Sequence, residues 1–368
     1  MDRDIIVIGG GMAGISLAAR LAETARVTVL ETESRPGHHS TGRSAAIFIL
    51  NYGGAVLRRL NQASQPFLLD PAEISETSLL TPRGELLVCG PGEGAAFAAY
   101  LDGAADMERI SVADAVGMVP ILRPERIEDA AYEPAAQDID VDRMLQGFLR
   151  LLRRRGGELA VGAGVTGMSR ENGVWKVTTM AGEWRAPIVV NAAGGWAETV
   201  AVMAGAKPRG LRPLRRSAAL IPAPAGHDVS RWPMVANAGE SWYAKPDAGK
   251  LMISPADEDP VEPHDVWAEE MVLAEGLARF EEAVTIEVTR VEHTWAGMRT
   301  FAPDRTPVIG FDGELDGFFW LAGQGGYGIQ TAPAVSALAE DLILGRKSEL
   351  TENLAESVSP LRAGLHPH

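Results

Sequence analysis

Three glycines near the N-terminus have the spacing of a phosphate-binding turn. Gly9, Gly11 and Gly14 follow the apolar run IIVI and precede the helical stretch ISLAARLAE. In such a turn the first glycine permits a tight bend, the second lets the backbone approach a pyrophosphate, and the third allows close packing of helix on strand. The helix N-terminus then stabilises the anion with free N–H groups. The spacing predicts a dinucleotide site, although a purely structural glycine turn has the same pattern.

A carboxylate after the next apolar run narrows the choice of dinucleotide. Glu31 follows the run at 26–30 and lies 22 residues after Gly9, a place from which an acid accepts ribose hydroxyls. A negative charge there disfavours the 2′-phosphate of NADP, whereas NAD and FAD both stay open. The order strand, turn, helix, strand makes a βαβ unit and predicts a parallel, doubly wound sheet.

The later segments predict a second kind of sheet. Short runs punctuated by Gly, Pro and Asp are typical of antiparallel strands, and five follow position 79: GELLVCG, GVWKVTTM, RSAALIPAP, SWYAKP and GKLMISPA. Apolar runs at 187–195 and 317–322 return to the pattern of buried parallel strands, and helices are expected over 140–157 and 332–344.

We therefore predict an α/β fold in which a discontinuous Rossmann-like domain with a parallel sheet is joined to an inserted, β-rich α+β domain. The parallel-sheet domain, which binds the nucleotide, is expected to comprise residues 1–76, 140–207 and 300–363. The inserted domain, which binds the substrate, is expected to comprise residues 77–139 and 208–299.

Composition excludes several classes of function. The formal net charge of −15 over 368 residues disfavours a nucleic-acid or anionic-membrane surface. Cys89 is the one cysteine, and the seven histidines lack H-x-x-x-H spacing, so we expect neither a disulfide nor a metal site. The sequence has no apolar run of membrane-spanning length and no signal-peptide pattern. We expect a cytoplasmic protein without a transmembrane segment.

Four stretches in this order resemble the D-amino-acid-oxidase-like flavoproteins: SRPGHHSTGRSAA, VNAAG, MRTFAPDRTPVIG and GFFWLAGQGGYGIQTAP. The resemblance implies FAD, held noncovalently. The last stretch also suits the flavin physically, because a glycine turn leading into a helix offers N–H groups to the flavin edge where negative charge develops. The residues expected around FAD are Gly9, Gly11, Met12, Ala13, Gly14, Glu31, Thr41, Gly42, Arg43, Ser44, Ala45, Ala46, Val165, Ala193, Gly194, Trp196, Arg299, Gly325, Gly326, Tyr327, Gly328, Ile329 and Gln330.

Within that family, five segments resemble bacterial D-arginine dehydrogenases: HSTGRSAA, LRPLRRSA, SWYAKPDAG, EHTWAGMR and QGGYGIQ. This likeness implies catalytic-site roles for seven residues. It places Arg216, Tyr243 and Arg299 around a substrate carboxylate, the Gly326 carbonyl near the amino group, Gln330 beside the flavin, Tyr52 on the active-site loop, and Glu85 where a guanidinium is received.

The residue types support these roles in part. Two guanidiniums and a phenol give an α-carboxylate fixed, charge-assisted binding. Arg215 and Arg216 lie in one strand-like segment, so only one can point inward, and an arginine on a strand more often faces solvent. Ile47 and Ile49 stand where the dehydrogenases have His and Thr, which removes hydrogen-bonding groups from the pocket. A basic or a hydrophobic D-amino acid therefore remains possible as substrate.

The resemblance implies oxidative deamination of a D-amino acid by hydride transfer to flavin N5, with quinone or O2 as the unidentified acceptor. Two alternatives stay open beside it: oxidation of glycine or a small secondary amine such as sarcosine, and a non-catalytic flavin-binding subunit. An NAD-dependent dehydrogenase is a weaker rival. His38 and His39 flank the flavin loop, where some family members attach FAD covalently, but the enzymes resembled here do not.

Overall fold

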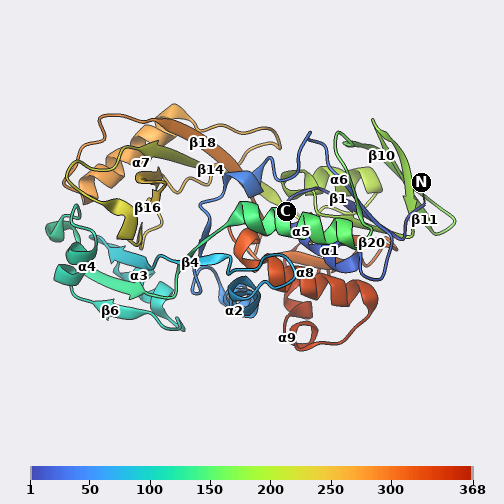
Figure 1. The fold of residues 1–368 in the computed structure, drawn as a ribbon, viewed down its shortest axis with the longest axis horizontal. Coiled ribbons are helices and arrows are strands. Elements are labelled where there is room, and N and C mark those ends of the chain that lie inside the picture. The colour runs from blue at the N-terminus through green and yellow to red at the C-terminus, as the bar shows by residue number, and fades with distance from the viewer. Residues whose placement is uncertain (1, 366–368) are drawn as a thin grey trace.

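A six-stranded sheet forms the centre of one lobe of the protein (Figure 1). The computed structural model describes residues 2–365. The strand order is β19-β20-β13-β1-β2-β9, and all neighbours are parallel except β19 and β20. The strands are β1 (Ile5–Ile8), β2 (Val27–Leu30), β9 (Glu158–Ala160), β13 (Ile188–Asn191), β19 (Val308–Phe311) and β20 (Phe318–Ala322).

Both faces of this sheet are covered, which explains its continuous apolar runs. Side chains alternate between the faces along a strand, so Ile5 and Val7 join the core under three helices while Ile6 and Ile8 join the core beneath a small antiparallel sheet. The helices are α1 (Met12–Leu21), α5 (Val141–Arg154) and α8 (Gly328–Leu344), and the small sheet is β10 (Val165–Glu171), β11 (Val174–Thr179) and β12 (Gly182–Ala186).

The other lobe is built on an eight-stranded sheet in the order β18-β14-β17-β16-β15-β5-β7-β6 (Figure 1). Its strands are β5 (Glu85–Cys89), β6 (Glu108–Ile110), β7 (Asp129–Glu133), β14 (Arg212–Ile221), β15 (Met234–Asn237), β16 (Tyr243–Asp247), β17 (Lys250–Ser254) and β18 (His293–Phe301). Helices α3 (Gly94–Leu101), α4 (Val112–Met118) and α7 (Glu270–Ala283) belong to this part of the chain.

The remaining elements are shorter or lie at the edges. A three-stranded sheet contains β3 (Ile47–Phe48), β8 (Gln137–Ile139) and β4 (Leu80–Pro82). Helix α2 (Ala55–Leu69) packs on α8, as does α9 (Glu349–Val358), and α6 (Ala197–Ala204) follows β13. Within residues 2–365, short 3-10 helices also lie at Ser40–Arg43, Pro124–Arg126, Gly194–Trp196 and Val229–Arg231.

The predicted fold class is confirmed, with a parallel sheet in one lobe and a β-rich mixed fold in the other. The assignment of residue ranges to two domains stays a prediction, although the two large sheets draw their strands from the corresponding ranges. Two details differ from expectation. Strands β5 and β15 pair in parallel rather than antiparallel. Helix α8 begins at Gly328 instead of Ala332 and keeps Pro333 inside.

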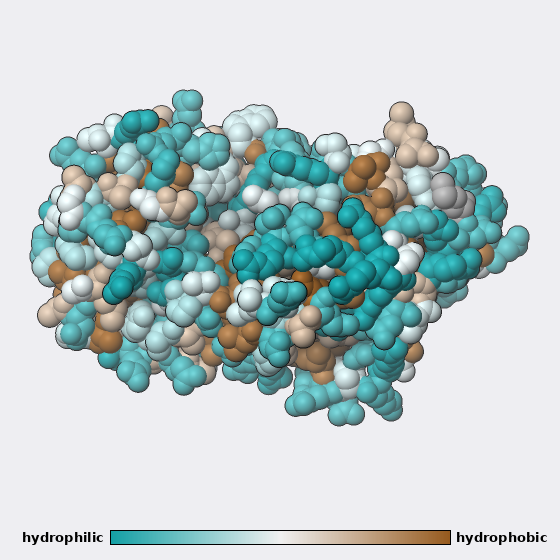
Figure 2. All heavy atoms as spheres, in the orientation of Figure 1, coloured by the Kyte–Doolittle hydropathy of each residue, from teal (hydrophilic) through white to brown (hydrophobic). Residues whose placement is uncertain are grey.

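The surface on the side shown in Figure 2 is mostly hydrophilic, with apolar residues scattered between polar ones. Among residues 2–365, the helices are all too short or too polar to cross a bilayer.

Gly14 is required by close packing. A Cβ at this position would lie 2.0 Å from the carbonyl oxygen of Gly9, a backbone atom that cannot rotate away. We predict that Gly14→Ala destabilises the protein by about 1–3 kcal/mol, the usual range for forced overpacking, as measured by urea unfolding. Gly117→Ala is the matched control, because its Cβ would meet no atom within 4 Å and alanine favours the helix. Equal stability of the two variants would contradict the packing argument.

Candidate active site

One cavity of about 590 Å³ is lined by residues from both large sheets. Its lining begins at the glycine turn after β1, passes the loop at 37–46, and reaches the inner strands of the eight-stranded sheet. The cavity therefore joins the predicted dinucleotide site to the predicted substrate residues.

The glycine turn gives the cavity a backbone wall. Gly9 has a φ of +111°, and a Cβ there would lie 2.3 Å from the carbonyl oxygen of Ala192. Gly11 differs, since its Cβ would meet only Thr41 Oγ1, at 3.4 Å. The N–H of Met12, in the first turn of α1, donates to that same hydroxyl at 3.0 Å. At this wall of the cavity a pyrophosphate could therefore contact the backbone at Gly11, the N-terminus of α1 and the Thr41 hydroxyl.

Glu31 is held in place at the end of β2. Its Oε2 accepts a hydrogen bond from Gly10 N at 2.7 Å, and its Oε1 accepts one from Glu33 N at 2.8 Å. The carboxylate lines the cavity with little solvent exposure. Each oxygen retains a lone pair, so this group can accept ribose hydroxyls without losing its backbone donors.

Twenty of the residues predicted around the cofactor line this cavity, and Gly14, Gly42 and Tyr327 do not. Gly14 and Gly42 lie where a Cβ would strike a backbone carbonyl, so their place is in packing. Tyr327 packs its ring on Tyr52, with 4.7 Å between the ring centroids, and precedes α8. Because α8 begins at Gly328, the cavity is also reached by the N-terminal turn of a helix.

Arg299 on β18 is the central cation of the substrate end. Its Nη1 donates to Tyr52 Oη at 3.2 Å, and its Nη2 donates to Tyr243 Oη at 3.4 Å. Among residues 2–365, no carboxylate lies within ion-pair distance of this guanidinium. The two phenols accept from it, so the contact with Arg299 does not use their own O–H groups.

The alternation of β14 decides between its two arginines. Arg216 lines the cavity, and its guanidinium bonds the Asp257 carbonyl and Glu258 Oε1 at 2.9 and 3.0 Å. Arg215 is not part of the cavity wall and pairs with acids at positions 257, 259 and 269. Burial alone would raise the pKa of the Tyr243 phenol, but the guanidiniums of Arg299 and Arg216 lower it overall. The Tyr243 phenol is therefore a stronger hydrogen-bond donor than usual.

The loop that carries Tyr52 is held by hydrogen bonds to buried amide side chains and to a buried carboxylate. Gln330 bonds the backbone of Ile49 on both sides, with its Oε1 accepting from N at 3.0 Å and its Nε2 donating to O at 3.3 Å. Glu133 accepts from Leu50 N at 2.7 Å and from Asn51 Nδ2 at 2.6 Å. Gln330 thus faces the cavity and also anchors the loop.

Glu85 occupies another part of the cavity wall, on β5. It is 2% exposed and accepts a hydrogen bond from Tyr100 Oη at 2.8 Å. Burial and the neighbouring Glu133 raise the pKa of Glu85 to about 8. The adjoining wall is apolar and includes Ile47, Ile49, Ala218, Met234 and Met252. Ile47 and Ile49, which stand where hydrogen-bonding side chains were expected from the resemblance, therefore both lie in the cavity wall.

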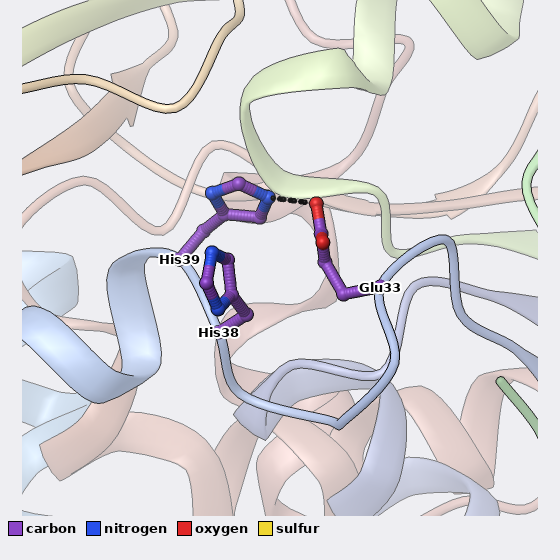
Figure 3. A group of neighbouring side chains, drawn as sticks. All are labelled: Glu33, His38 and His39. Carbon is purple, nitrogen blue, oxygen red and sulfur yellow. Dashed lines mark hydrogen bonds and ion pairs between the residues drawn. The ribbon is translucent and has the colours of Figure 1, made fainter. Parts of the chain in front are cut away.

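The tertiary structure also assembles a group that the histidine spacing did not reveal. Glu33, His38 and His39 bring one ligand atom each within 4.8 Å of one another. Figure 3 shows His39 Nε2 against Glu33 Oε1, at 3.0 Å. His38 Nε2 lies 3.6 Å from Asp265 Oδ2. The absence of a metal stays a prediction.

Sequence reasoning missed several residues of the cavity wall. Tyr100 of α3, Asn237 at the end of β15 and Glu240 in the following turn line it, but none of them stands in a recognisable sequence pattern. Glu133 was missed for a different reason, because a carboxylate that caps backbone N–H groups of a distant loop has no local sequence signal.

The chain belongs to the FAD dependent oxidoreductase family (DAO), whose pattern it matches over residues 4–342. It is 25% identical to hydrogen cyanide synthase subunit HcnC of Pseudomonas aeruginosa, over 92% of each chain. It is 26% identical to glycine oxidase of Bacillus licheniformis, over 93% of each chain. The crystal structure of glycine oxidase from Geobacillus kaustophilus has the same fold, with a TM-score of 0.83, 20% identity, and coverage of 100% of this chain and 99% of that one.

The protein is thus an FAD-dependent oxidoreductase, and the prediction of FAD over NAD is confirmed. When bound, FAD supplies a two-electron acceptor for a substrate that lies against it. The turn at 9–14, Glu31 and the start of α8 are the elements of this chain that fit the cofactor. Noncovalent attachment stays a prediction.

Gly11 should matter for the cofactor but not for the fold. We predict that Gly11→Ala weakens FAD binding to the apoprotein by about tenfold to a hundredfold, because a methyl group intrudes where the pyrophosphate must approach. Its φ of −78° suits alanine, so the melting temperature of the apoprotein should not change. Quenching of flavin fluorescence measures the affinity. Wild-type affinity in this variant would contradict the placement of the pyrophosphate.

Proposed function

We propose that this protein oxidises a D-amino acid to its imino acid, which hydrolyses to a 2-oxo acid and ammonia. The observation that carries the proposal is the Arg299 guanidinium, which lines the cavity with two phenols and no carboxylate as partners. A cation withdrawn from bulk water and left without an anion is costly unless a ligand supplies one. An α-carboxylate fits this position.

The remaining roles follow from that contact. Arg299 and Tyr243 bind the carboxylate, with Arg216 beside them, and so aim Cα–H at the flavin, which accepts hydride at N5. The Gly326 carbonyl receives the substrate amine, a role that the likeness to D-arginine dehydrogenases supports. Tyr52 or a water takes the amine proton. Hydride transfer requires no separate base for the Cα proton, and Glu85 faces the side chain.

The side chain of the substrate is a finer part of the proposal. Apolar Ile47, Ile49 and Met234 favour a hydrophobic chain, whereas Glu85 favours a basic one. The likeness to D-arginine dehydrogenases supports the basic choice, and the two isoleucines oppose it. D-methionine, D-leucine, D-phenylalanine, D-lysine and D-arginine therefore form the substrate panel.

A second candidate is oxidation of glycine or a small secondary amine. The observation that favours it is the 26% identity with a glycine oxidase across nearly the whole chain. The same guanidinium would bind the carboxylate of either substrate class. A non-catalytic flavin-binding subunit is opposed by the same unpaired guanidinium.

Anaerobic stopped-flow reduction of the purified holoprotein tests these candidates together. D- and L-amino acids, glycine and N-methylglycine are mixed separately with the oxidised flavoprotein. Fastest bleaching by a D-amino acid is expected. Reduction by L-isomers alone, or faster reduction by N-methylglycine, would overturn the proposal, and a flavin that stays oxidised with every compound would support the non-catalytic alternative.

Arg299 should contribute to activity and not to stability. We predict that Arg299→Met lowers kcat/KM by about a hundredfold or more, because charged hydrogen bonds contribute about 1.5–3 kcal/mol each. Its melting temperature should be equal to or above that of the wild type, since an unpaired interior cation is removed. Arg153→Met, on the exposed face of α5, is the charge-matched control. A fall in stability with unchanged kcat/KM would assign Arg299 to structure instead.

Gly326 provides a subtler test of the same geometry. A Cβ at this position would lie 2.8 Å from Arg299 Nη1, and the guanidinium would have to move. We predict that Gly326→Ala lowers kcat/KM by about tenfold or more with an unchanged melting temperature, because a displacement of this size disturbs substrate orientation. An unchanged kcat/KM would show that the guanidinium does not orient the substrate.

A further inference from the structure

Glu85 and Glu133 lie directly opposite each other on neighbouring strands. The antiparallel register of β5 and β7 pairs these two positions, which places both side chains on one face of the sheet, with Cβ atoms about 4.5–5.5 Å apart. Both residues are buried, at 2% and 0% exposure. Two carboxylates this close cannot both be ionised without a large penalty, so the pair titrates as a unit.

The hydrogen-bond partners decide which carboxyl group holds the proton. Glu133 accepts from Leu50 N, Asn51 N and Asn51 Nδ2, and three donors on one carboxyl group favour its ionised form. Within the described part of the chain, the one hydrogen bond that Glu85 accepts comes from the Tyr100 phenol. Among residues 2–365, no lysine or arginine forms an ion pair with Glu85. The proton of the pair therefore belongs on Glu85.

Other charged groups around the pair reinforce this assignment. Glu240, in the turn after β15, adds a third negative charge that acts on Glu85. The positive charge of Arg58 on α2 lowers the pKa of Glu133. The Arg58 guanidinium is held by hydrogen bonds to the carbonyls of Gly53, Tyr100 and Asp102. Burial raises the pKa of Glu133 as well, but its hydrogen-bond donors and the charge of Arg58 oppose that effect. At Glu85 burial acts first, and the negative charges of Glu133 and Glu240 add to it.

We propose that Glu133 and Tyr100 set the charge of Glu85 and thereby the side-chain preference of the pocket. The pocket accepts a substrate with an uncharged side chain while Glu85 is protonated. It accepts a substrate with a cationic side chain once the Glu85 proton has left to solvent. This inference rests on the proposed function. It accounts for a pocket with an acid and an apolar wall together, because at neutral pH Glu85 presents an uncharged O–H rather than a carboxylate.

Infrared titration of the oxidised holoprotein tests the carboxyl pair without any substrate. A protonated-carboxyl band should be present at pH 6, disappear with a midpoint near 8, and be missing in Glu85→Gln. Glu133→Gln removes the opposing charge and should lower the midpoint. Tyr100→Phe removes a hydrogen bond that stabilises the ionised form and should raise it. A band that is absent at pH 6, or that persists in Glu85→Gln, would overturn the assignment of the proton.

Substrate selectivity tests the consequence. D-arginine stays charged at all these pH values, and D-citrulline is its uncharged counterpart. The kcat/KM of D-arginine divided by that of D-citrulline should rise by about tenfold per pH unit as the pH increases toward the midpoint of the Glu85 titration, and should be constant above it. The α-amino group titrates in both compounds, so its effect on kcat/KM cancels in the ratio. Tyr100→Phe should move the whole profile to higher pH, a shift that a merely structural role would not produce.

The outcomes separate the two proposals. If D-amino acids reduce the flavin but the ratio does not change with pH, the selectivity inference is wrong and the proposed function stands. If no D-amino acid reduces the flavin, the proposed function fails, and the selectivity inference fails with it. The infrared titration then still decides which carboxyl group holds the proton.

Discussion

The site depends on one guanidinium that has no anion of its own. Arg299 projects from β18 to two phenols whose chain positions are 247 and 56 residues away. Holding a cation there requires rigid surroundings, because a mobile arginine would find water or a carboxylate instead. The pairing of β14 with β18 along nine residues supplies that rigidity. Gly326, which has no side chain, leaves room above the guanidinium.

Charge is distributed unevenly around this cation. Arg215, Arg216 and Arg305 all have acidic partners in the segment 257–269, which follows β17. Those ion pairs fasten the segment over the eight-stranded sheet and neutralise its charge, so they offer a substrate little net field. Arg299 alone among these four arginines is left to a ligand. The acids Glu85 and Glu133 are the opposite case, since among residues 2–365 neither forms an ion pair with a lysine or arginine.

The loop bearing Tyr52 connects these two regions. Gln330 from the start of α8 and Glu133 from β7 bond successive backbone groups at Ile49 and Leu50. Tyr52, one of the two phenols that contact Arg299, is thus positioned by helix α8 and by strand β7, which pairs with the strand that carries Glu85.

The sequence by itself determined the parallel sheet and the glycine turn, because these depend on local patterns of apolar runs and glycine spacing. The resemblance to a flavoprotein family, carried by four longer stretches, implied FAD, since the glycine spacing and Glu31 left NAD and FAD both open. Family resemblance also placed Arg299, Tyr243 and Tyr52 together. The resemblance also chose Arg216 over Arg215, but only the tertiary structure gives the physical reason, because strand alternation defines two faces of β14 without saying which one faces the cavity. The pairing of Glu85 with Glu133 likewise depends on the register of strands 40 residues apart, and no local pattern encodes a register.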